Sequence, residues 1–272
     1  MKKYFLTSDV HGFYDALQNG LKEAGFDVEN ENHIFCLLGD AFDRGNQNIQ
    51  VFEFLKKMKK LGRLIYIRGN HEYMYLEILK KWRPESCDIH NKTDETIVEF
   101  SGFDEEKQKE ATWQEYCQTP LVQEVAKFIR ETCVNYVELG KYILVHGNIP
   151  RIENPYTGAC AYEPFWRKSP DYMWDSCIWA NGMLENHVFH IKEPGKTIVC
   201  GHVRASWGNI VQKKYLWKKM YPSHYADPEE FENPEYRGIY KAEDGSLIGL
   251  DALTYKTGKV NILVLDEENL NK

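Results

Sequence analysis

Three short stretches near the N-terminus decide the fold: Asp9-Val10-His11-Gly12, Gly39-Asp40-Ala41-Phe42-Asp43-Arg44-Gly45 and Gly69-Asn70-His71-Glu72. Each contains glycine, which favours a tight turn, and each directly follows an apolar run that is typical of a buried strand. We expect strands at 4–8, 33–38 and 63–68, with amphipathic helices at 13–26 and 48–61 between them. This strand–helix repetition predicts parallel strands, whose carboxyl ends bring the three stretches to one edge of a sheet.

A second group of apolar segments follows in the rest of the chain. They predict a helix, a hairpin, another strand and a terminal hairpin, at 121–132, 136–145, 196–200 and 247–265. The turn of the terminal hairpin is expected at Thr257-Gly258. We expect a single domain over residues 1–272, with inserted segments at about 83–120 and 211–237, where the sequence is polar and weakly periodic.

Composition places the chain among ordinary globular proteins. Its 272 residues, with a hydrophobic fraction of 43%, are enough for one sizeable core. A formal net charge of -7 does not attract nucleic acid or anionic membranes, so we expect no stable nucleic acid partner and no membrane. Seven cysteines without a Cys-x-x-Cys pair, and a start that does not resemble a signal peptide, predict a cytoplasmic location.

Side chains that bind metal ions follow five of the predicted strands: Asp9, His11, Asp40, Asn70, His146 and His202. A turn at Gly12 would let Asp9 and His11 reach one ion, and the two oxygens of Asp40 can bridge two ions. Each motif alone has a simpler explanation, such as a helix cap at Asn70. Together, five strand ends with mixed oxygen and nitrogen ligands predict a two-metal site for phosphate ester hydrolysis.

These segments resemble the signature of the calcineurin-like metallophosphoesterases, in particular the bacterial and phage-type members of the phosphoprotein (serine/threonine) phosphatase branch. The family pattern runs GDxHG, GDxxDRG, GNHE, then HG and a later His, and Ser8 here replaces the first Gly. The resemblance extends from Tyr4 to about Leu265. It implies an α/β fold, a four-layer α/β/β/α metallophosphoesterase sandwich of two mixed sheets with flanking helices.

The resemblance also implies a role for each residue of the site. It assigns the first metal to Asp9 and His11, the bridge to Asp40, and the second metal to Asn70, His146 and His202. His71 is the implied proton donor to the leaving group, oriented by Asp43, while Arg44 and Asn70 contact the substrate. The implied reaction is hydrolysis of a phosphate monoester by direct attack of a water that bridges two divalent ions. Manganese is the expected metal, and iron or zinc suits the same ligands.

One departure from the family pattern concerns the substrate. Family members usually carry a second phosphate-binding arginine, often as W-x-R, whereas this chain has Ile178-Trp179-Ala180-Asn181. Arg167 or Arg204 could replace it, although a solvated surface charge is the simpler interpretation of each. The leading hypothesis is a serine/threonine protein phosphatase-like enzyme that acts on a phosphorylated protein or a small phosphoester.

Two alternatives stay open. A symmetrical dinucleoside polyphosphate hydrolase, acting on diadenosine tetraphosphate, would share the fold and the metal motifs. Its second motif usually lacks the Asp43-Arg44 pair, and its third commonly ends in Asp rather than Glu72. A non-catalytic metal-binding scaffold would have no need of His71. Nucleobase stacking and core packing are both open for an aromatic cluster, Tyr162, Phe165, Trp166, Tyr172, Trp174 and Trp179. The pattern names no oligomeric state.

Overall fold

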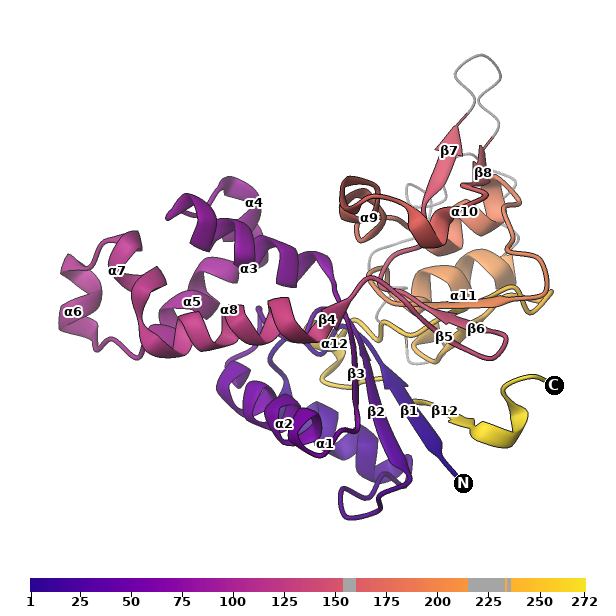
Figure 1. The fold of residues 1–272 in the computed structure, drawn as a ribbon, viewed down its shortest axis with the longest axis horizontal. Coiled ribbons are helices and arrows are strands. Elements are labelled where there is room, and N and C mark those ends of the chain that lie inside the picture. The colour runs from indigo at the N-terminus through magenta and orange to yellow at the C-terminus, as the bar shows by residue number, and fades with distance from the viewer. Residues whose placement is uncertain (154–159, 215–232, 234–235) are drawn as a thin grey trace.

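The computed structural model describes residues 1–153, 160–214, 233 and 236–272, and its centre is a pair of five-stranded mixed sheets (Figure 1). The first sheet has the strand order β12-β1-β2-β3-β4, in which β1 to β4 are parallel and β12 is antiparallel to β1. Its strands are β1 (Lys3–Thr7), β2 (His33–Leu38), β3 (Leu64–Ile67), β4 (Cys133–Val134) and β12 (Leu263–Asp266). The three predicted parallel strands are therefore confirmed.

The second sheet has the order β10-β11-β9-β6-β5, with a parallel centre and an antiparallel strand at each edge. Its strands are β5 (Val137–Leu139), β6 (Tyr142–Leu144), β9 (Thr197–Cys200), β10 (Tyr240–Lys241) and β11 (Leu247–Gly249). A separate two-stranded ribbon joins β7 (Arg151–Glu153) to β8 (Cys160–Tyr162). The predicted hairpin at 136–145 and the strand at 196–200 are both present in the second sheet.

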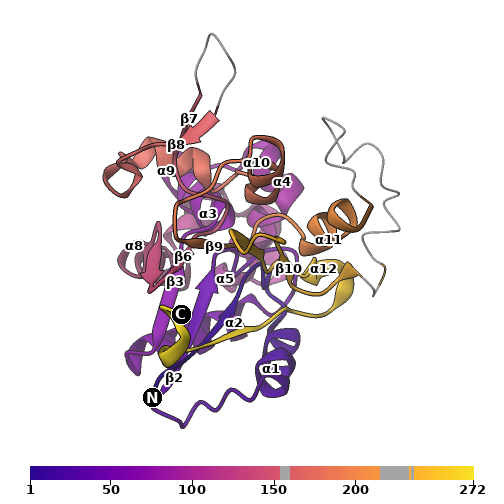
Figure 2. The same ribbon diagram turned by 90° about the vertical axis from the view of Figure 1, so that its right-hand side faces the viewer.

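The two sheets pack face to face, and helices cover both outer faces. Along β1, Leu6 contributes to the core between the sheets with Leu144 and Val199, whereas Phe5 packs in the core under the helices. This alternation follows from the two-residue period of a strand. The outer helices are α1 (Tyr14–Glu23) and α2 (Asn48–Lys60) on the first sheet, and α9 (Asp171–Cys177), α10 (Gly182–Val188) and α11 (Ala205–Lys214) on the second. Figure 1 shows α1 and α2 together on one side of β1, β2 and β3, and Figure 2 shows the same elements turned by 90°, in agreement with the predicted layered α/β fold.

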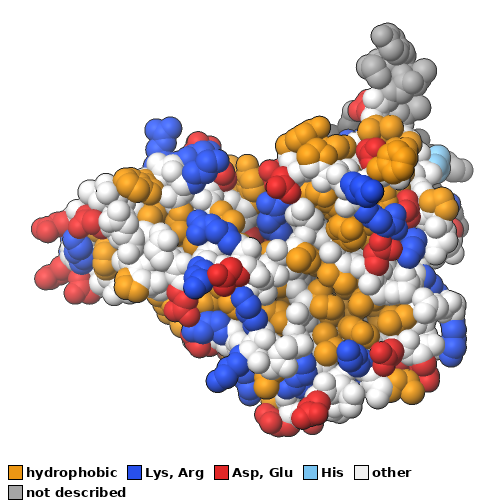
Figure 3. Space-filling view, viewed as in Figure 1, with side chains coloured by type: hydrophobic (Ala, Val, Ile, Leu, Met, Phe, Trp, Pro, Cys, Tyr) orange, Lys and Arg blue, Asp and Glu red, His pale blue; other side chains and the backbone are white. Residues whose placement is uncertain are grey.

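The segment predicted as an insertion at 83–120 is helical. It forms α4 (Ser86–Asn91), α5 (Thr93–Ser101), α6 (Glu105–Glu110) and α7 (Trp113–Gln118), between α3 (Asn70–Lys81) and α8 (Pro120–Thr132). These helices extend to one side of the sheets, and charged side chains gather at the outer end over α6 (Figures 1 and 3). In the second predicted insertion, 211–214 belong to α11, while 215–232 and 234–235 lie outside the described residues.

The predicted terminal hairpin is wrong. β11 pairs with β9 in the second sheet, β12 pairs with β1 in the first, and α12 (Thr254–Thr257) lies where the turn was expected. Alternating polarity identifies a strand with one buried face, but it does not choose the neighbour with which that strand pairs. Two short 3-10 helices cover Trp166–Lys168 and Glu267–Asn269. Of the described helices, none has the length and apolar character needed to cross a bilayer.

Candidate metal centre

Most of the predicted site residues lie in strained turns at the strand ends. Ten non-glycine residues among those described have a left-handed backbone, and six of them are predicted site residues, namely Asp9, His11, Asp40, Asp43, Arg44 and His202. Each such conformation costs roughly 1–3 kcal/mol, so neighbouring contacts must hold it. The turn after β1 is bonded to the turn after β2, since Asp9 N donates to Gly39 O at 3.1 Å and His11 N donates to Asp40 O at 3.0 Å.

Glu72 holds the turn that carries Asp40. Its carboxylate is fully buried and accepts hydrogen bonds from the backbone N–H groups of Asp40, Ala41 and Gly69 and from the Tyr66 hydroxyl, at 2.8 to 2.9 Å. A Cβ atom at Gly69 would collide with the Asp40 carboxylate, so only glycine fits there. The sequence pattern includes Glu72 in its third motif but does not reveal this structural role.

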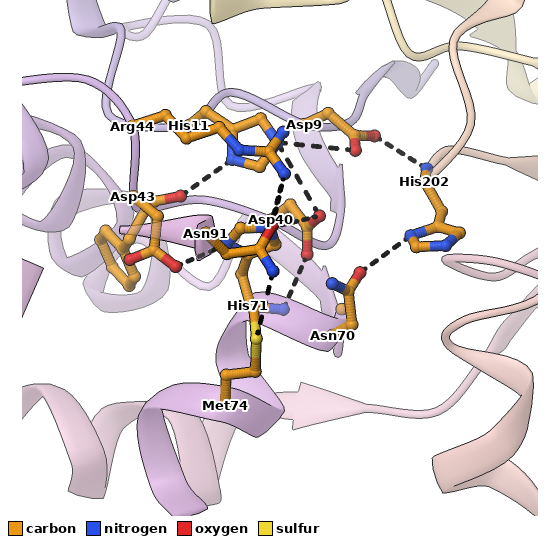
Figure 4. Close-up of polar contacts among 12 residues, drawn as sticks. Asp9, His11, Asp40, Asp43, Arg44, Asn70, His71, Met74, Asn91 and His202 are labelled. Carbon is orange, nitrogen blue, oxygen red and sulfur yellow. Dashed lines mark hydrogen bonds and ion pairs between the residues drawn. The ribbon is translucent and has the colours of Figure 1, made fainter. Parts of the chain in front are cut away.

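The predicted metal ligands converge on one centre, where Figure 4 shows Asp9, His11, Asp40, Asn70 and His202 and where His146 also reaches Asp40. Two groups of three side chains place their ligand atoms within 4.8 Å of one another: His11, Asp40 and His71, and Asp40, His146 and His202. Asp40 belongs to both groups, as expected for a bridging carboxylate. Asp9 Oδ1 lies 3.9 Å from His11 Nε2, and Asn70 Oδ1 lies 2.9 Å from both His146 Nε2 and His202 Nδ1.

Hydrogen bonds to backbone carbonyls set the tautomers of two of these histidines. His11 Nδ1 lies 3.0 Å from Phe42 O, and His146 Nδ1 lies 2.7 Å from Leu38 O. Because a carbonyl oxygen only accepts, Nδ1 carries the proton in the neutral form of each ring, and Nε2 is then the nitrogen that offers an electron pair to a metal at the centre. Together with the carboxylate and amide oxygens, these nitrogens fit a pair of divalent cations.

Burial and charge reinforce this interpretation. Burial, together with the nearby charges of Asp251 and Asp40, raises the pKa of Asp9 well above its usual range, and burial raises the pKa of Asp251 to about 6. Burial would also raise the pKa of Asp40, but the imidazoles, with His146 first, bring it well below its usual range. Burial lowers the pKa of His202 to about 3, so its ring is neutral, the form that binds metal. Bound cations would relieve the repulsion between these carboxylates.

A second set of side chains lies beside the ligand groups. Asp43 is buried, and its Oδ2 lies 2.5 Å from Nδ1 of His71. The other ring nitrogen of His71 lies 3.8 Å from Asp40 Oδ2, so this ring connects Asp43 to the centre. Arg44 reaches toward the same place, with Nη1 3.0 Å from His11 Nε2 and its guanidinium 4.8 Å from the ring centre of Tyr255. Sequence reasoning found Asp43, His71 and Arg44, but not Tyr255 or the nearby Asp251.

Two further polar side chains reach this set from the inserted helices. Thr93 Oγ1 donates to Asp43 Oδ2 at 2.6 Å, and Arg44 Nη2 donates to Asn91 Oδ1 at 2.8 Å. Neither residue was predicted, because the segment 83–120 contains no periodic or motif signal that distinguishes them. Their contacts with Asp43 and Arg44 exist only once α4 and α5 fold back over the second motif.

A cavity of about 540 Å³ lies close to the histidines of the second sheet. Trp179 lines it, and its ring centre is 6.1 Å from that of His202. Tyr172 also lines it and is 71% exposed, against 39% for Trp179. In the aromatic cluster of the sequence analysis, Tyr162, Trp166 and Trp174 are instead buried in the core. The cluster therefore divides into three packing residues, two exposed cavity residues and Phe165, which is exposed but does not line the cavity.

Trp179, Ala180 and Asn181, in the stretch that departs from the family pattern, line the same cavity. Asn181 lines the cavity and caps α10, where its Oδ1 accepts from Leu184 N at 3.0 Å. Arg167 instead forms a partly exposed ion-pair group with Glu138 and Glu193. The interpretation of Arg167 as a surface charge is thus confirmed. Arg151, another cavity residue, pairs through Nε with buried Glu185 at 2.9 Å.

Sequence comparison links the chain to known phosphoesterases. The sequence model of the calcineurin-like phosphoesterases matches residues 2–232. The asymmetrical bis(5'-nucleosyl)-tetraphosphatase PrpE of Bacillus subtilis is 31% identical over 83 residues, which cover 27% of this chain and 34% of that protein. Serine/threonine-protein phosphatase 7 of Arabidopsis thaliana is 31% identical over 97 residues, which cover 32% of this chain and 23% of that protein. The match thus spans about a third or less of the length of these relatives.

Structural comparison supports the same fold. The cold-active protein-tyrosine phosphatase of a psychrophilic Shewanella species has a TM-score of 0.50 and 16% identity, over 98% of this chain and 76% of that one. The family match covers most of the chain, and the buried Asp and His groups supply the metal donors that a metal-dependent phosphoesterase requires. The chain therefore belongs to the calcineurin-like phosphoesterase family.

Proposed function

We propose that this protein is a serine/threonine protein phosphatase-like enzyme that hydrolyses phosphate monoesters by direct attack of water. The observation that carries the proposal is the pair of ligand groups that share Asp40 beside the buried His71–Asp43 pair. A non-catalytic scaffold would require the ligands alone. A phosphatase also requires a proton donor and a cation for the substrate, and His71 and Arg44 supply both types of group.

In this proposal six side chains hold two divalent metals: Asp9, His11, Asp40, Asn70, His146 and His202. Asp40 bridges, because it belongs to both ligand groups. When bound, the metals would activate water and neutralise charge on the phosphate oxygens. Manganese is the proposed metal, and iron or zinc would suit the same donors. The Glu72 hydrogen bonds keep the Asp40 turn in place, which fixes the bridging carboxylate without adding a ligand.

The protein's own side chains would position the phosphate and protonate the leaving group. Arg44 presents a planar guanidinium that can donate two parallel hydrogen bonds to phosphate oxygens. Asn70 contributes its amide beside the same centre. The Nε2 atom of His71 would donate a proton to the departing alkoxide, while Asp43 holds Nδ1 and stabilises the cationic ring. His71 Nε2 could also reach a metal from its position, so metal content and turnover must be measured separately in variants.

Support for the protein phosphatase assignment comes from the Asp43-Arg44 pair, from Glu72, and from the Arabidopsis phosphatase among the relatives. A dinucleoside polyphosphate hydrolase is the second candidate, and the cavity beside His202 favours it. Exposed Trp179 and Tyr172 offer flat faces on which a nucleobase can stack. The tetraphosphatases among the relatives are consistent with this candidate.

A substrate panel tests the two candidates. Manganese-loaded protein would be incubated with phosphoserine peptides, p-nitrophenyl phosphate, cyclic nucleotides and diadenosine tetraphosphate. Release of phosphate from the peptides with the highest kcat/KM supports the first candidate, and nucleotide products from diadenosine tetraphosphate support the second. If no phosphate ester is hydrolysed under any metal condition, the proposal of an enzyme is wrong.

Two general assignments belong to the same proposal. We treat residues 1–272 as one domain, because the two sheets share a core that contains Leu6, Leu144 and Val199. The cytoplasm is the proposed compartment, since all seven cysteines are free thiols, the state that a reducing compartment maintains. The proposed partners are phosphorylated proteins or small phosphoesters.

A further inference from the structure

The junction between α4 and α5 contacts the proposed proton donor through Asp43. Thr93, the first residue of α5, is fully buried, and its hydroxyl donates to Asp43 Oδ2 at 2.6 Å. The same oxygen lies 2.5 Å from Nδ1 of His71. Hydrogen bonds to a carboxylate favour its ionised form and fix its orientation. Thr93 therefore acts on His71 through Asp43 without touching the centre itself.

The same junction contacts the proposed phosphate-binding arginine. Arg44 Nη2 donates to Asn91 Oδ1 at 2.8 Å, as Figure 4 shows. The other end of the Asn91 amide is also fixed, because Nδ2 donates to Cys87 O at 3.0 Å. An amide held at both ends presents its oxygen to the guanidinium in one orientation. This contact reduces the number of positions that the long Arg44 side chain can adopt before substrate binds.

The backbone between these two residues explains why they act together. Lys92 separates Asn91 from Thr93 and has φ of 66°, a left-handed conformation that ends α4 and begins α5. This turn directs both neighbouring side chains to the second motif, one to Arg44 and the other to Asp43. The inserted helices are anchored there a second time, since Asn48, which accepts from Asp43 N at 3.0 Å, donates to Glu99 of α5 at 2.6 Å.

We propose that the α4–α5 junction is a positioning element for hydrolysis, in which Thr93 orients the Asp43–His71 pair and Asn91 orients Arg44. The inference rests on the proposed phosphatase function and extends it to two residues that contact neither metal nor substrate. It assigns the inserted helices a specific task, which is to complete the support of the second motif. Thr93 should affect protonation of the leaving group, whereas Asn91 should affect phosphate binding.

The test of Thr93 compares two substrates with leaving groups of different basicity. The departing phenolate is more basic than p-nitrophenolate and depends more on a proton from the enzyme. Weaker proton donation should therefore lower the rate more with phenyl phosphate than with p-nitrophenyl phosphate. Thr93→Val should lower kcat/KM for phenyl phosphate about tenfold, the size expected from one lost hydrogen bond, and should lower it less for p-nitrophenyl phosphate. Thr93→Ser retains the hydroxyl and should restore most of the activity.

A matched control comes from the same helix. Thr96 is also buried in α5, but its hydroxyl donates to the backbone oxygen of Lys92 at 3.3 Å. Thr96→Val should leave the ratio between the two substrates unchanged. The role of Thr93 would be overturned if Thr93→Val lowered kcat/KM equally for both substrates. It would also be overturned if the ratio of the two kcat/KM values were the same in Thr93→Val and Thr96→Val. If the wild-type protein hydrolysed neither substrate, the proposed function itself would fail, which distinguishes the two results.

The test of Asn91 uses inorganic phosphate as a competitive inhibitor. Asn91→Ala should weaken inhibition by phosphate about tenfold and raise KM, with bound manganese unchanged, because Arg44 loses one fixed contact. Unchanged phosphate inhibition together with unchanged KM would contradict the role of Asn91. Metal content is measured for every variant, so that a lost ligand group cannot be mistaken for a lost positioning contact.

Discussion

The two halves of the candidate centre differ in how their side chains are held. The half on the first sheet contains Asp9, His11 and Asp40 in left-handed turns that bond to one another and to Glu72. The half on the second sheet contributes His146 and His202, and the cavity with its exposed aromatic residues adjoins it. The first half holds three buried ligands in turns that bond to one another, whereas the second combines ligands with surface that a substrate can reach.

This difference separates the reaction from the choice of substrate. Three motifs that bring carboxylates, imidazoles and Arg44 together determine that a phosphate ester can be hydrolysed. The cavity wall around Trp179 and Asn181 belongs to the stretch in which the sequence departs from the family pattern, and Asn181 carries no charge. Variants of the first half should therefore affect every substrate, and variants of the second half should affect substrates selectively.

The largest effect is expected for Asp40. Asp40→Asn removes the carboxylate shared by both ligand groups, so the protein should lose bound metal and at least a thousandfold in activity on every substrate. Metal analysis of the purified variant beside wild-type protein checks this. Full occupancy of two metals in the variant would refute the bridging role and with it the special position of the first half.

The next largest effect is expected for His71. His71→Asn should keep its metals and lose about a hundredfold to ten-thousandfold in turnover, the range typical of a missing general acid. The measurement is metal content together with kcat on p-nitrophenyl phosphate and a phosphoserine peptide. Loss of metal in this variant would instead place His71 among the ligands, as its 3.8 Å distance from Asp40 allows.

A selective effect is expected in the second half. Replacing both Trp179 and Tyr172 by alanine should raise KM for diadenosine tetraphosphate at least tenfold, since stacking on one base contributes roughly 1–3 kcal/mol. The KM for p-nitrophenyl phosphate should stay within a factor of about two. Phe165→Ala is the matched control, because Phe165 is exposed to a similar degree as Tyr172 but does not line the cavity. Equal changes on both substrates would remove the distinction between the two halves.

The smallest effect concerns pH and Asp251. Its folded-state pKa of about 6 lies above the usual value near 4, so between these values the folded protein keeps a proton that the unfolded chain has lost. The free energy of unfolding of metal-free protein should therefore fall as pH rises from about 4 to about 6. Asp251→Asn stays neutral and should lose this part of the dependence. Denaturant unfolding of both proteins with chelator checks it, and identical pH slopes would contradict it.

Much of the first half could be predicted because its information is local. Glycine, a preceding apolar run and a ligand side chain all lie within a few residues of one another, and β1 to β3 follow from that pattern. The residues that support these motifs depend on contacts that are distant in sequence. Thr93 reaches Asp43 across 50 positions, and nothing in its neighbourhood indicates the contact. The prediction of a terminal hairpin at 247–265 was wrong for the same reason. Local alternation of polarity could not show that β11 and β12 pair in different sheets.

We propose that the side chains gathered around Asp40 form a two-metal centre for phosphate ester hydrolysis. Titration of chelated protein with manganese, followed by p-nitrophenyl phosphate hydrolysis and bound metal per chain, tests it most directly. Activity should rise to a plateau as two ions bind and should be lost again on chelation. A chain that binds no manganese, or hydrolysis that chelation does not change, would contradict it.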